Sequence, residues 1–344
     1  MNVKYILLMV LIGMLSQHSH GQYSDFKYKK KNHSSEAGFA HTTRQARYLS
    51  GGAGLHLLNY FGDLTPNENR IGNTLKVTRP GISIYGNYNF SPHIVFGAQL
   101  LYGRITGDDY NADPYKSSSR KYVRNLNFRN DLIGLNLTGS YYLFKDPFEF
   151  YKRKDFNLYV TAGVSIFYSN PKGKVLGQAE DGSSSGKSFR WVALRPLGTE
   201  GQNNPESGRK KYSAIQLGIP FGGGVRIRLG YRTDLYLEAT LHYLLSDYID
   251  DVGSSYVDLG VFGDDELARK LSDRSKETVA AVKEEQRDLA KINDATTPYS
   301  YVSVYDGKTY QVYKGFGEEG GIRGGSRNDL FTLTSFKFSY IFTK

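Results

Sequence analysis

FNLYVTAGVSIFY, residues 156–168, is the most regular alternation of apolar and polar residues in the chain. Apolar side chains occupy every second position: Phe156, Leu158, Val160, Ala162, Val164, Ile166 and Tyr168. The positions between them are mostly small or polar, although Tyr159 and Phe167 are among them. Successive side chains of a β-strand point to opposite faces, so this period of two predicts a long strand with one apolar face.

The same alternation predicts seven further strands. They cover residues 53–61, 80–90, 94–103, 132–144, 214–229, 235–246 and 335–342. Most of them reach the roughly 9–11 residues that a tilted strand needs to cross a membrane, whereas strands of soluble proteins average about five or six. We therefore expect an all-β fold, an eight-stranded antiparallel transmembrane β-barrel of the outer membrane.

The connections support this expectation, because long and short ones alternate. The long ones cover 62–79, 104–130, 169–212 and 247–329, and the other three are short. Cell-surface loops and periplasmic turns of a barrel alternate in this way, which places both termini in the periplasm. A soluble β-sandwich has no reason to sort its connections by length.

The N-terminus predicts a secretion signal. Residues 1–21 carry an early lysine, an apolar stretch of about eleven residues and then small and polar residues, with a cut before Gln22. A membrane anchor is the alternative, but a helical span needs roughly 20 apolar residues. We expect residues 22–50 to form a periplasmic segment and residues 51–344 to form the barrel, located in the cell outer membrane.

Composition excludes several functions. The chain contains no cysteine, which rules out disulfides, zinc–thiolate sites and cysteine nucleophiles. Its 28 tyrosines and 38 glycines favour β structure. The net charge of +10 is scattered along the chain instead of gathered on one surface, so no nucleic-acid partner is expected. Outward-facing cations are expected to meet outer-membrane lipid and the phosphates of lipopolysaccharide.

Charged residues at lumen-facing positions are Arg226, Arg228, Glu238, His242 and Lys337. An eight-stranded barrel is just wide enough to be filled by its own side chains, so we expect a filled lumen in place of a pore. The two arginines lie on the strand next to that of Glu238, which predicts an ion pair in the lumen. A catalytic pair of His242 with Glu238 is disfavoured because no nucleophile can be placed beside it.

Two glycine-rich stretches, GGAG (51–54) and GGGVRIRLG (222–230), superficially resemble phosphate-binding loops. Neither lies between a strand and a helix, so we interpret them as barrel glycines that leave room for large side chains opposite.

Three acidic pairs lie in the predicted loops: Asp108–Asp109, Asp250–Asp251 and Asp264–Asp265. None has the ligand spacing of a calcium-binding EF-hand loop. They are interpreted as solvated loop carboxylates or as hydrogen-bonding groups at the mouth of the lumen. We expect neither a metal nor a cofactor.

Residues 264–293, DDELARKLSDRSKETVAAVKEEQRDLAKIN, form the one predicted helical stretch. They are charged nearly all round, which indicates a weakly amphipathic surface helix inserted in the last extracellular loop. A helix that binds a partner is the alternative.

The segment LNYFGDL, residues 58–64, ends the first predicted strand. Leu55, Leu57 and Phe61 are expected on the lipid-facing side. Tyr60 and Phe61 are expected in the outer aromatic girdle, because an interface suits a ring with a polar edge.

Nine segments, in order from about residue 50 to the C-terminus, resemble the family of the outer-membrane protein PorG of the type IX secretion system. They are LNYFGDL (58–64), YGRITGDD (102–109), FRNDLIGLNLTGSYYLF (128–144), IFYSNPKGKV (166–175), LRPLGTEGQ (194–202), IQLGIPFGGGVRIRL (215–229), SDYIDDVGSSYVD (246–258), ARKLSDRS (268–275) and RGGSRNDLFTLTSFKFSYIF (323–342). The basic stretch 27–31 and the loop 64–76 have no counterpart in the resemblance.

The resemblance implies a non-enzymatic eight-stranded barrel that links a periplasmic ring of a PorK-like lipoprotein and a PorN-like protein to the outer membrane, and that supports gliding motility where this is present. The enlarged periplasmic turn would then make the partner contact, with candidate residues Phe148, Tyr151, Lys152, Arg153 and Lys154. Two other functions stay open, a stand-alone structural or adhesive barrel and a lipid-modifying barrel enzyme.

Overall fold

A computed structural model describes residues 47–65, 77–111, 119–147, 149–177, 188–325 and 327–342. The expected signal peptide, the basic stretch 27–31 and Phe148 lie outside these residues. The chain divides into two units, residues 1–44 and 45–344, and everything below concerns the second.

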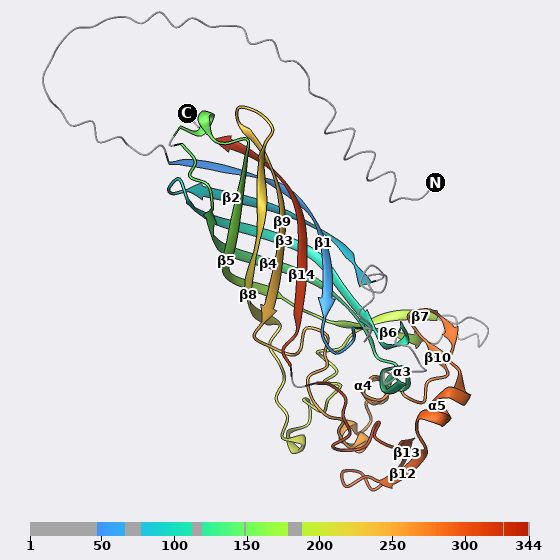
Figure 1. Ribbon diagram of the computed structural model, residues 1–344. Coiled ribbons are helices and arrows are strands. Elements are labelled where there is room, and N and C mark those ends of the chain that lie inside the picture. The colour runs from blue at the N-terminus through green and yellow to red at the C-terminus, as the bar shows by residue number, and fades with distance from the viewer. Residues whose placement is uncertain are drawn as a thin grey trace, which may run out of the picture. The chain divides into compact units, whose positions relative to one another are not determined.

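Eight long antiparallel strands form a closed barrel (Figure 1). They are β1 (Tyr48–Phe61), β2 (Arg79–Asn89), β3 (Ile94–Asp108), β4 (Asn127–Tyr142), β5 (Phe156–Tyr168), β8 (Ile215–Arg228), β9 (Thr233–Leu244) and β14 (Leu330–Phe342). Each of these eight strands pairs with the next of the eight along the chain, including β5 with β8 and β9 with β14, and the pairing of β1 with β14 closes the ring. The predicted strands are confirmed, although β1 begins at Tyr48, before the expected barrel start at residue 51.

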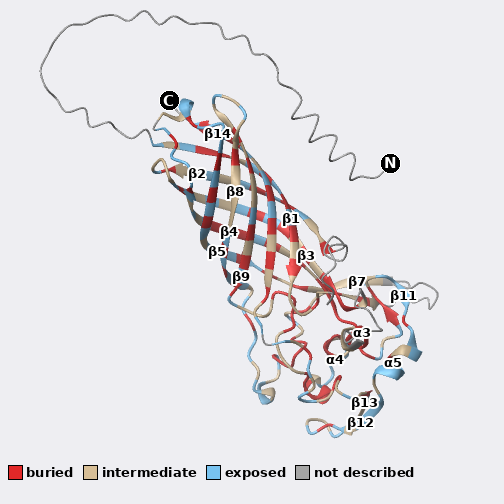
Figure 2. Cartoon of the chain, in the orientation of Figure 1, coloured by how far each residue is buried: buried red, intermediate tan, exposed pale blue. Residues whose placement is uncertain are grey.

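The barrel wall alternates exposed and buried residues, as the sequence predicts (Figure 2). In β5 the exposed positions are those of the apolar series that begins at Phe156, and the positions between them are buried or half-buried. Large apolar side chains therefore cover the outside of the barrel, with exposed fractions such as 66% for Leu55 and 64% for Ile84. In water this belt would be strongly unfavourable, and in a bilayer it is expected.

The long connections fold into an assembly at the barrel end opposite the short turns (Figure 1). We call this assembly the cap; it consists of the described residues of 109–126, 169–214 and 245–329. Its elements are η1 (Asp109–Asn111), α3 (Ser119–Arg124), β6 (Lys172–Gly177), β7 (Ser188–Ala193), η3 (Pro205–Ser207), η4 (Leu259–Phe262), α4 (Glu266–Ser272), β10 (Val279–Ala280), β11 (Glu285–Gln286), α5 (Leu289–Ala295), β12 (Pro298–Val302) and β13 (Thr309–Tyr313). At the opposite end, η2 (Phe150–Lys152) lies in the turn between β4 and β5.

The cap has its own apolar cores. One contains Tyr122, Val123, Tyr256, Ile292 and Phe316, and a second contains Val175, Leu194 and Leu271. These residues come from connections far apart in the sequence, so the long loops fold against one another.

The predicted single helix over 264–293 is wrong. This range contains the short helix α4, then a hairpin of the two-residue strands β10 and β11, and then the first residues of α5. Arg274 donates to the carbonyl oxygen of Lys174 at 2.8 Å, and Arg287 donates to the carbonyl oxygens of Tyr122 and Val123 at 2.5 and 2.9 Å. Both arginines are buried. These tertiary hydrogen bonds hold the chain in turns, and the helical propensity of the segment is overridden.

Among the described residues, no helix combines the length and the apolar character that a membrane crossing requires.

Candidate functional site: the barrel lumen and its two ends

The lumen is filled, as the sequence predicts. At the cap end it is closed by an apolar cluster that includes Leu58, Phe167 and Phe331, all with no exposed surface. At the opposite end Tyr142, Tyr159 and Tyr236 pack together with Val95. Between these clusters lies a cavity of about 30 Å³, which holds about two water molecules. The side chains that the structure describes thus occupy the lumen near both of its ends.

Polar side chains between the two clusters bond to one another. His56 lies 2.8 Å from Ser335 Oγ through Nδ1 and 2.7 Å from Ser83 Oγ through Nε2. Gln99 donates to Ser83 Oγ at 2.9 Å and accepts from Asn136 at 3.1 Å. Such a network joins five strands and fixes these side chains in one arrangement, although Asn136 Oδ1 has no hydrogen-bond partner among the described residues.

The predicted ion pair of Arg226 or Arg228 with Glu238 is wrong. Glu238 pairs with Lys337 of β14 at 2.6 Å and accepts from Tyr159 at 2.8 Å. Arg226 pairs with Asp146, a residue of the turn after β4. Arg228 donates to the carbonyl oxygen of Arg153.

The register explains the error. Glu238 lies opposite Gly224, and Arg226 lies opposite Tyr236. The two charged residues are therefore diagonal neighbours, offset by two residues along the strands, and do not lie directly opposite each other. Each then has a nearer partner: Lys337 for Glu238 and the turn residue Asp146 for Arg226.

His242 is also buried, and its ring stacks on that of Phe331 with a centroid distance of 4.6 Å and an interplanar angle of 5°. Its side-chain contacts are Ser165 Oγ and Thr240 Oγ1, each at 3.4 Å. Because Glu238 is held by Lys337 and Tyr159, the two residues do not form an acid–base pair.

The mouth of the barrel carries the most unusual arrangement, centred on Tyr60. The hydroxyl of this buried residue lies 2.6 Å from Oδ2 of Asp250 and 2.8 Å from Oδ1 of Asp329, and both carboxyl groups are fully buried. The other oxygens of the two groups accept the backbone N–H of Val252 and Ile249. One phenol has one proton to donate, so the second carboxyl group needs a proton of its own to complete the triad.

The electrostatics agree with this geometry. Burial raises the pKa of Asp250 well above its usual range, and the neighbouring Asp329 and Asp63 raise it further. Burial also raises the pKa of Asp329 to about 7. Both shifts favour the protonated form of a carboxyl group, in the direction that the hydrogen bonds of the triad require.

A second group of buried residues adjoins the triad. Arg323 donates through Nη1 to Glu200 Oε1 at 2.9 Å and to the carbonyl oxygen of Asp251 at 2.8 Å. Asp251 in turn accepts from Thr199 and Tyr212, each at 2.5 Å. Burial raises the pKa of Asp251 to about 6, which the Arg323 cation opposes.

Arg124 of α3 completes the mouth. It makes a two-pronged contact with Asp109, at 2.7 Å from Nε and 2.8 Å from Nη2, and both residues are buried. It also donates to the carbonyl oxygens of Asp63 and Arg323. We call these eight residues the mouth cluster: Tyr60, Asp109, Arg124, Glu200, Asp250, Asp251, Arg323 and Asp329.

The structure corrects the expectation for Tyr60 and decides between the two interpretations for two of the acidic pairs. Tyr60 lies inside the barrel and not in the outer aromatic girdle, because its hydroxyl finds two buried carboxyl groups. Asp250 and Asp251 are buried hydrogen-bonding groups at the lumen mouth, which was one of the two interpretations. Asp264 and Asp265 are exposed loop residues, as the other interpretation expects.

Sequence reasoning did not identify the mouth cluster as a unit, because its members are spread over six separate stretches of the chain. A signal was nevertheless present. Seven of the eight residues lie in segments quoted for the PorG resemblance: Tyr60 in LNYFGDL, Asp109 in YGRITGDD, Glu200 in LRPLGTEGQ, Asp250 and Asp251 in SDYIDDVGSSYVD, and Arg323 and Asp329 in RGGSRNDL. The fold brings these segments together at one end of the barrel.

At the other end, Arg153 is not available for the partner contact expected of it. It is 1% exposed, pairs with Asp234 at 2.9 Å, and donates to the carbonyl oxygens of Phe150 and Tyr231, both at 2.8 Å. Arg153 therefore fastens the turn after β4 to the turn after β8.

Three predicted contact residues of this turn are exposed. The ring of Tyr151 stacks on that of Tyr231, with an interplanar angle of 11° and 6.2 Å between centroids. Lys152 forms a solvent-exposed pair with Glu149, and the Lys154 ammonium lies over the ring of Phe144. Phe148 lies outside the described residues.

No protein-family model matches the sequence, and no curated protein matches it. Solved structures with a similar fold include Neisserial surface protein A, with 10% identity and a TM-score of 0.33 over 86% of this chain and 97% of that one. Ail of Yersinia pestis has 7% identity and a TM-score of 0.30 over 86% and 99% of the two chains. OprG of Pseudomonas aeruginosa has 8% identity and a TM-score of 0.32 over 87% and 97%. The barrel follows from this protein's own strand pairing, and similarities at this level say nothing about its activity.

Proposed function

We propose that this protein is a non-enzymatic outer-membrane barrel that anchors a rigid cap on the cell surface. The observation that carries the proposal is the closed lumen: an apolar plug, a bonded polar layer and a tyrosine cluster occupy it from end to end. Among the described residues, the cavity between the two clusters is too small for a transported solute or a substrate. The working surfaces are therefore the two ends of the barrel.

Location is the first part to test. The apolar belt supports insertion in the outer membrane, and the short turns then face the periplasm. Fractionation of cells, followed by gel mobility with and without boiling, should place a heat-modifiable band in the outer-membrane fraction. A soluble protein without a mobility shift would contradict the proposal.

A second, more specific function is membership of the type IX secretion machine, as the link between a ring of PorK-like and PorN-like proteins and the outer membrane. The sequence resemblance motivates it. It is supported by the turn after β4, which we place in the periplasm. Arg153 fixes the backbone of this turn by hydrogen bonds, and the side chains of Tyr151, Lys152 and Lys154 are exposed on it.

The experiment compares three strains: wild type, Tyr151→Ala/Lys154→Ala and the matched cap variant Tyr299→Ala/Lys308→Ala. Affinity purification in mild detergent should recover the PorK-like and PorN-like proteins from the first and third strains only. Secretion of proteins with a C-terminal type IX signal should fall in the second strain and in a deletion. Normal secretion in the deletion would leave the stand-alone structural or adhesive barrel as the function.

A further inference from the structure

The outer edge of the apolar belt is well defined on three neighbouring strands. Tyr102 of β3, Ile133 of β4 and Tyr168 of β5 lie in register across the sheet. Their exposed fractions are 48%, 51% and 48%. Aromatic side chains at this level mark the boundary between hydrocarbon and headgroups in a membrane barrel.

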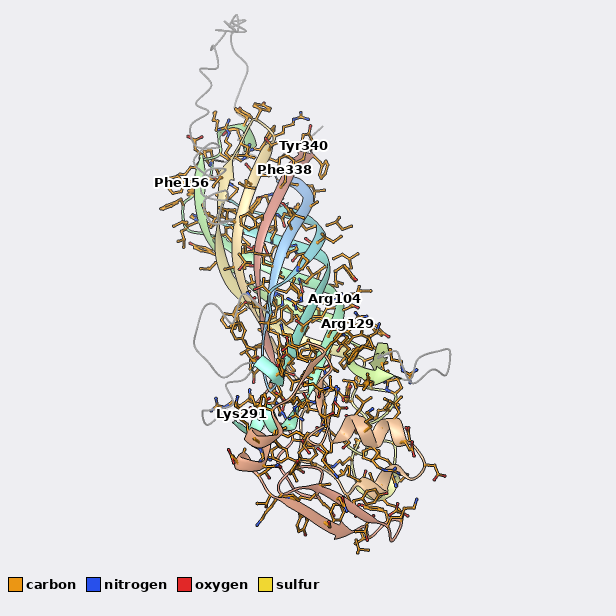
Figure 3. The ribbon with its side chains drawn as sticks, turned by 90° about the vertical axis from the view of Figure 1, so that its right-hand side faces the viewer. Arg104, Arg129, Phe156, Lys291, Phe338 and Tyr340 are labelled. Atoms are coloured by element: carbon orange, nitrogen blue, oxygen red, sulfur yellow. The ribbon has the colours of Figure 1, made fainter. Side chains whose placement is uncertain are left out.

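Cations occupy the next outward-facing positions. Arg104 pairs with Asp131 across β3 and β4, one step beyond Tyr102, and Arg129 lies opposite Thr106 one step further. Arg129 is also in register with Lys172 of β6. Figure 3 shows Arg104 and Arg129 close together at the cap end of the barrel, whereas Phe156, Phe338 and Tyr340 lie toward the other end.

Arg129 is held in place without being neutralised. Its guanidinium carbon lies 4.4 Å from the centre of the Trp191 ring, and its Nε has no hydrogen-bond partner among the described residues. Arg104 donates to Asp131 at 2.5 Å, and its side chain is 39% exposed. Of the two guanidinium groups, only that of Arg104 is paired with a carboxylate among the residues that the structure describes, and Lys172 lies in register beside Arg129.

We propose that Arg104, Arg129 and Lys172, which we call the rim patch, bind the phosphate of a phosphorylated glycolipid in the outer leaflet. The proposal rests on the membrane orientation given under the proposed function. A planar guanidinium donates two parallel hydrogen bonds to phosphate oxygens, and a stacked arginine loses little freedom on binding. The apolar surface directly below, at Tyr102 and Ile133, offers contact to the acyl chains. A lipid satisfies both halves of this surface, whereas free phosphate satisfies only the cations.

The single tryptophan of the chain makes a direct test possible, because Trp191 contacts Arg129. The full-length protein in neutral detergent is titrated with diphosphoryl lipid A, with the same lipid lacking phosphates, and with inorganic phosphate. Diphosphoryl lipid A should change the Trp191 fluorescence and bind at least about tenfold more tightly than the other two, since charge-assisted hydrogen bonds contribute about 1.5–3 kcal/mol each and 1.4 kcal/mol is tenfold.

The variant Arg104→Gln/Arg129→Gln/Lys172→Gln should lose this preference, measured by native mass spectrometry of bound lipid. The control Arg232→Gln, a cation at the opposite end of the barrel, should keep it. Equal binding of both lipids, equal binding of inorganic phosphate, or an unchanged triple variant would overturn the proposal. Heat-modifiable gel mobility of the protein in vesicles is recorded in parallel. If the mobility shift is absent, both the membrane assignment and the rim patch are overturned. If the shift is present but both lipids bind equally, the rim patch alone is overturned.

Discussion

Nη1 of Arg323 lies 2.9 Å from Oε1 of Glu200, and both side chains are buried. The pair joins the end of the last long loop to the loop before β8. Arg323 also donates to the carbonyl oxygens of Asp251 and Ser272, so one cation holds three segments of the cap. The cap is therefore a folded structure on the barrel, tied together by this buried cation.

Arg323→Met should destabilise the cap by about 3–5 kcal/mol, because it leaves the Glu200 and Asp251 carboxylates buried without their cation. Limited proteolysis should cut the cap faster, while the barrel keeps its heat-modifiable mobility. Lys152→Met, which removes a solvent-exposed pair, should cost less than about 1 kcal/mol. Equal protease resistance of wild type and Arg323→Met would contradict this prediction.

The cap should lose stability as pH rises from about 4 to about 8. The raised pKa of Asp250, and those of Asp329 at about 7 and Asp247 at about 8, all come mainly from burial. A carboxyl group with a raised pKa in the folded state binds more protons when folded, so its contribution is complete below its unfolded pKa near 3.9 and disappears above its folded pKa.

Proteolysis of the cap at pH 5.5 and pH 8.5, normalised to an unfolded substrate, measures this pH dependence. Other charged groups act on these three carboxyl groups: Asp63 adds negative charge near all of them, Glu200 adds negative charge near Asp247, and Lys121 adds positive charge near Asp250. Asp250→Asn removes one proton-sharing partner and should flatten the pH dependence. The same slope in this variant and in wild type would assign the effect to other groups.

Arg153→Met should destabilise the end of the barrel opposite the cap by about 3–5 kcal/mol, since Asp234 would remain as an unpaired buried charge. The midpoint temperature of the gel mobility shift should fall. Tyr151→Ala, which changes an exposed ring on the same turn, should leave that midpoint nearly unchanged.

The purified protein should not conduct ions in planar bilayers, because its lumen is closed at both ends. Glu238→Gln leaves Lys337 without its partner and should lower stability without producing conductance. Stable single-channel currents from the wild type would show that the plugs move, and would remove the main support for an anchoring function.

Gly222→Ala should impair assembly, because a Cβ there would lie 2.1 Å from the carbonyl oxygen of Ala239 on the neighbouring strand. Overpacking of this kind costs about 1–3 kcal/mol or more. At Gly139 the nearest atom to an added Cβ is Cε1 of Phe96, at 4.0 Å. Gly139→Ala should therefore be neutral. Yield of heat-modifiable protein after refolding into vesicles distinguishes the two variants.

The sequence by itself determined the strands, their number and which side chains face outward. Alternation over Phe156–Tyr168 is a local property, and a pleated strand turns it directly into two faces. The separation of long and short connections likewise follows from reading along the chain. The filled lumen was also predictable, because the width of a barrel depends mainly on its number of strands and eight strands leave room only for their own side chains.

Only the tertiary structure decided which charges meet. Arg226, Glu238 and Lys337 were recognisable as inward residues, but their pairing depends on strand register and on a turn residue that reaches into the lumen. Tyr60 changed from a girdle residue to the centre of a buried triad, because Asp250 and Asp329 arrive from 190 and 269 residues away. The helix expected over 264–293 was replaced by turns for the same reason. Buried charges are placed by partners distant in sequence, and sequence periodicity carries no information about those partners.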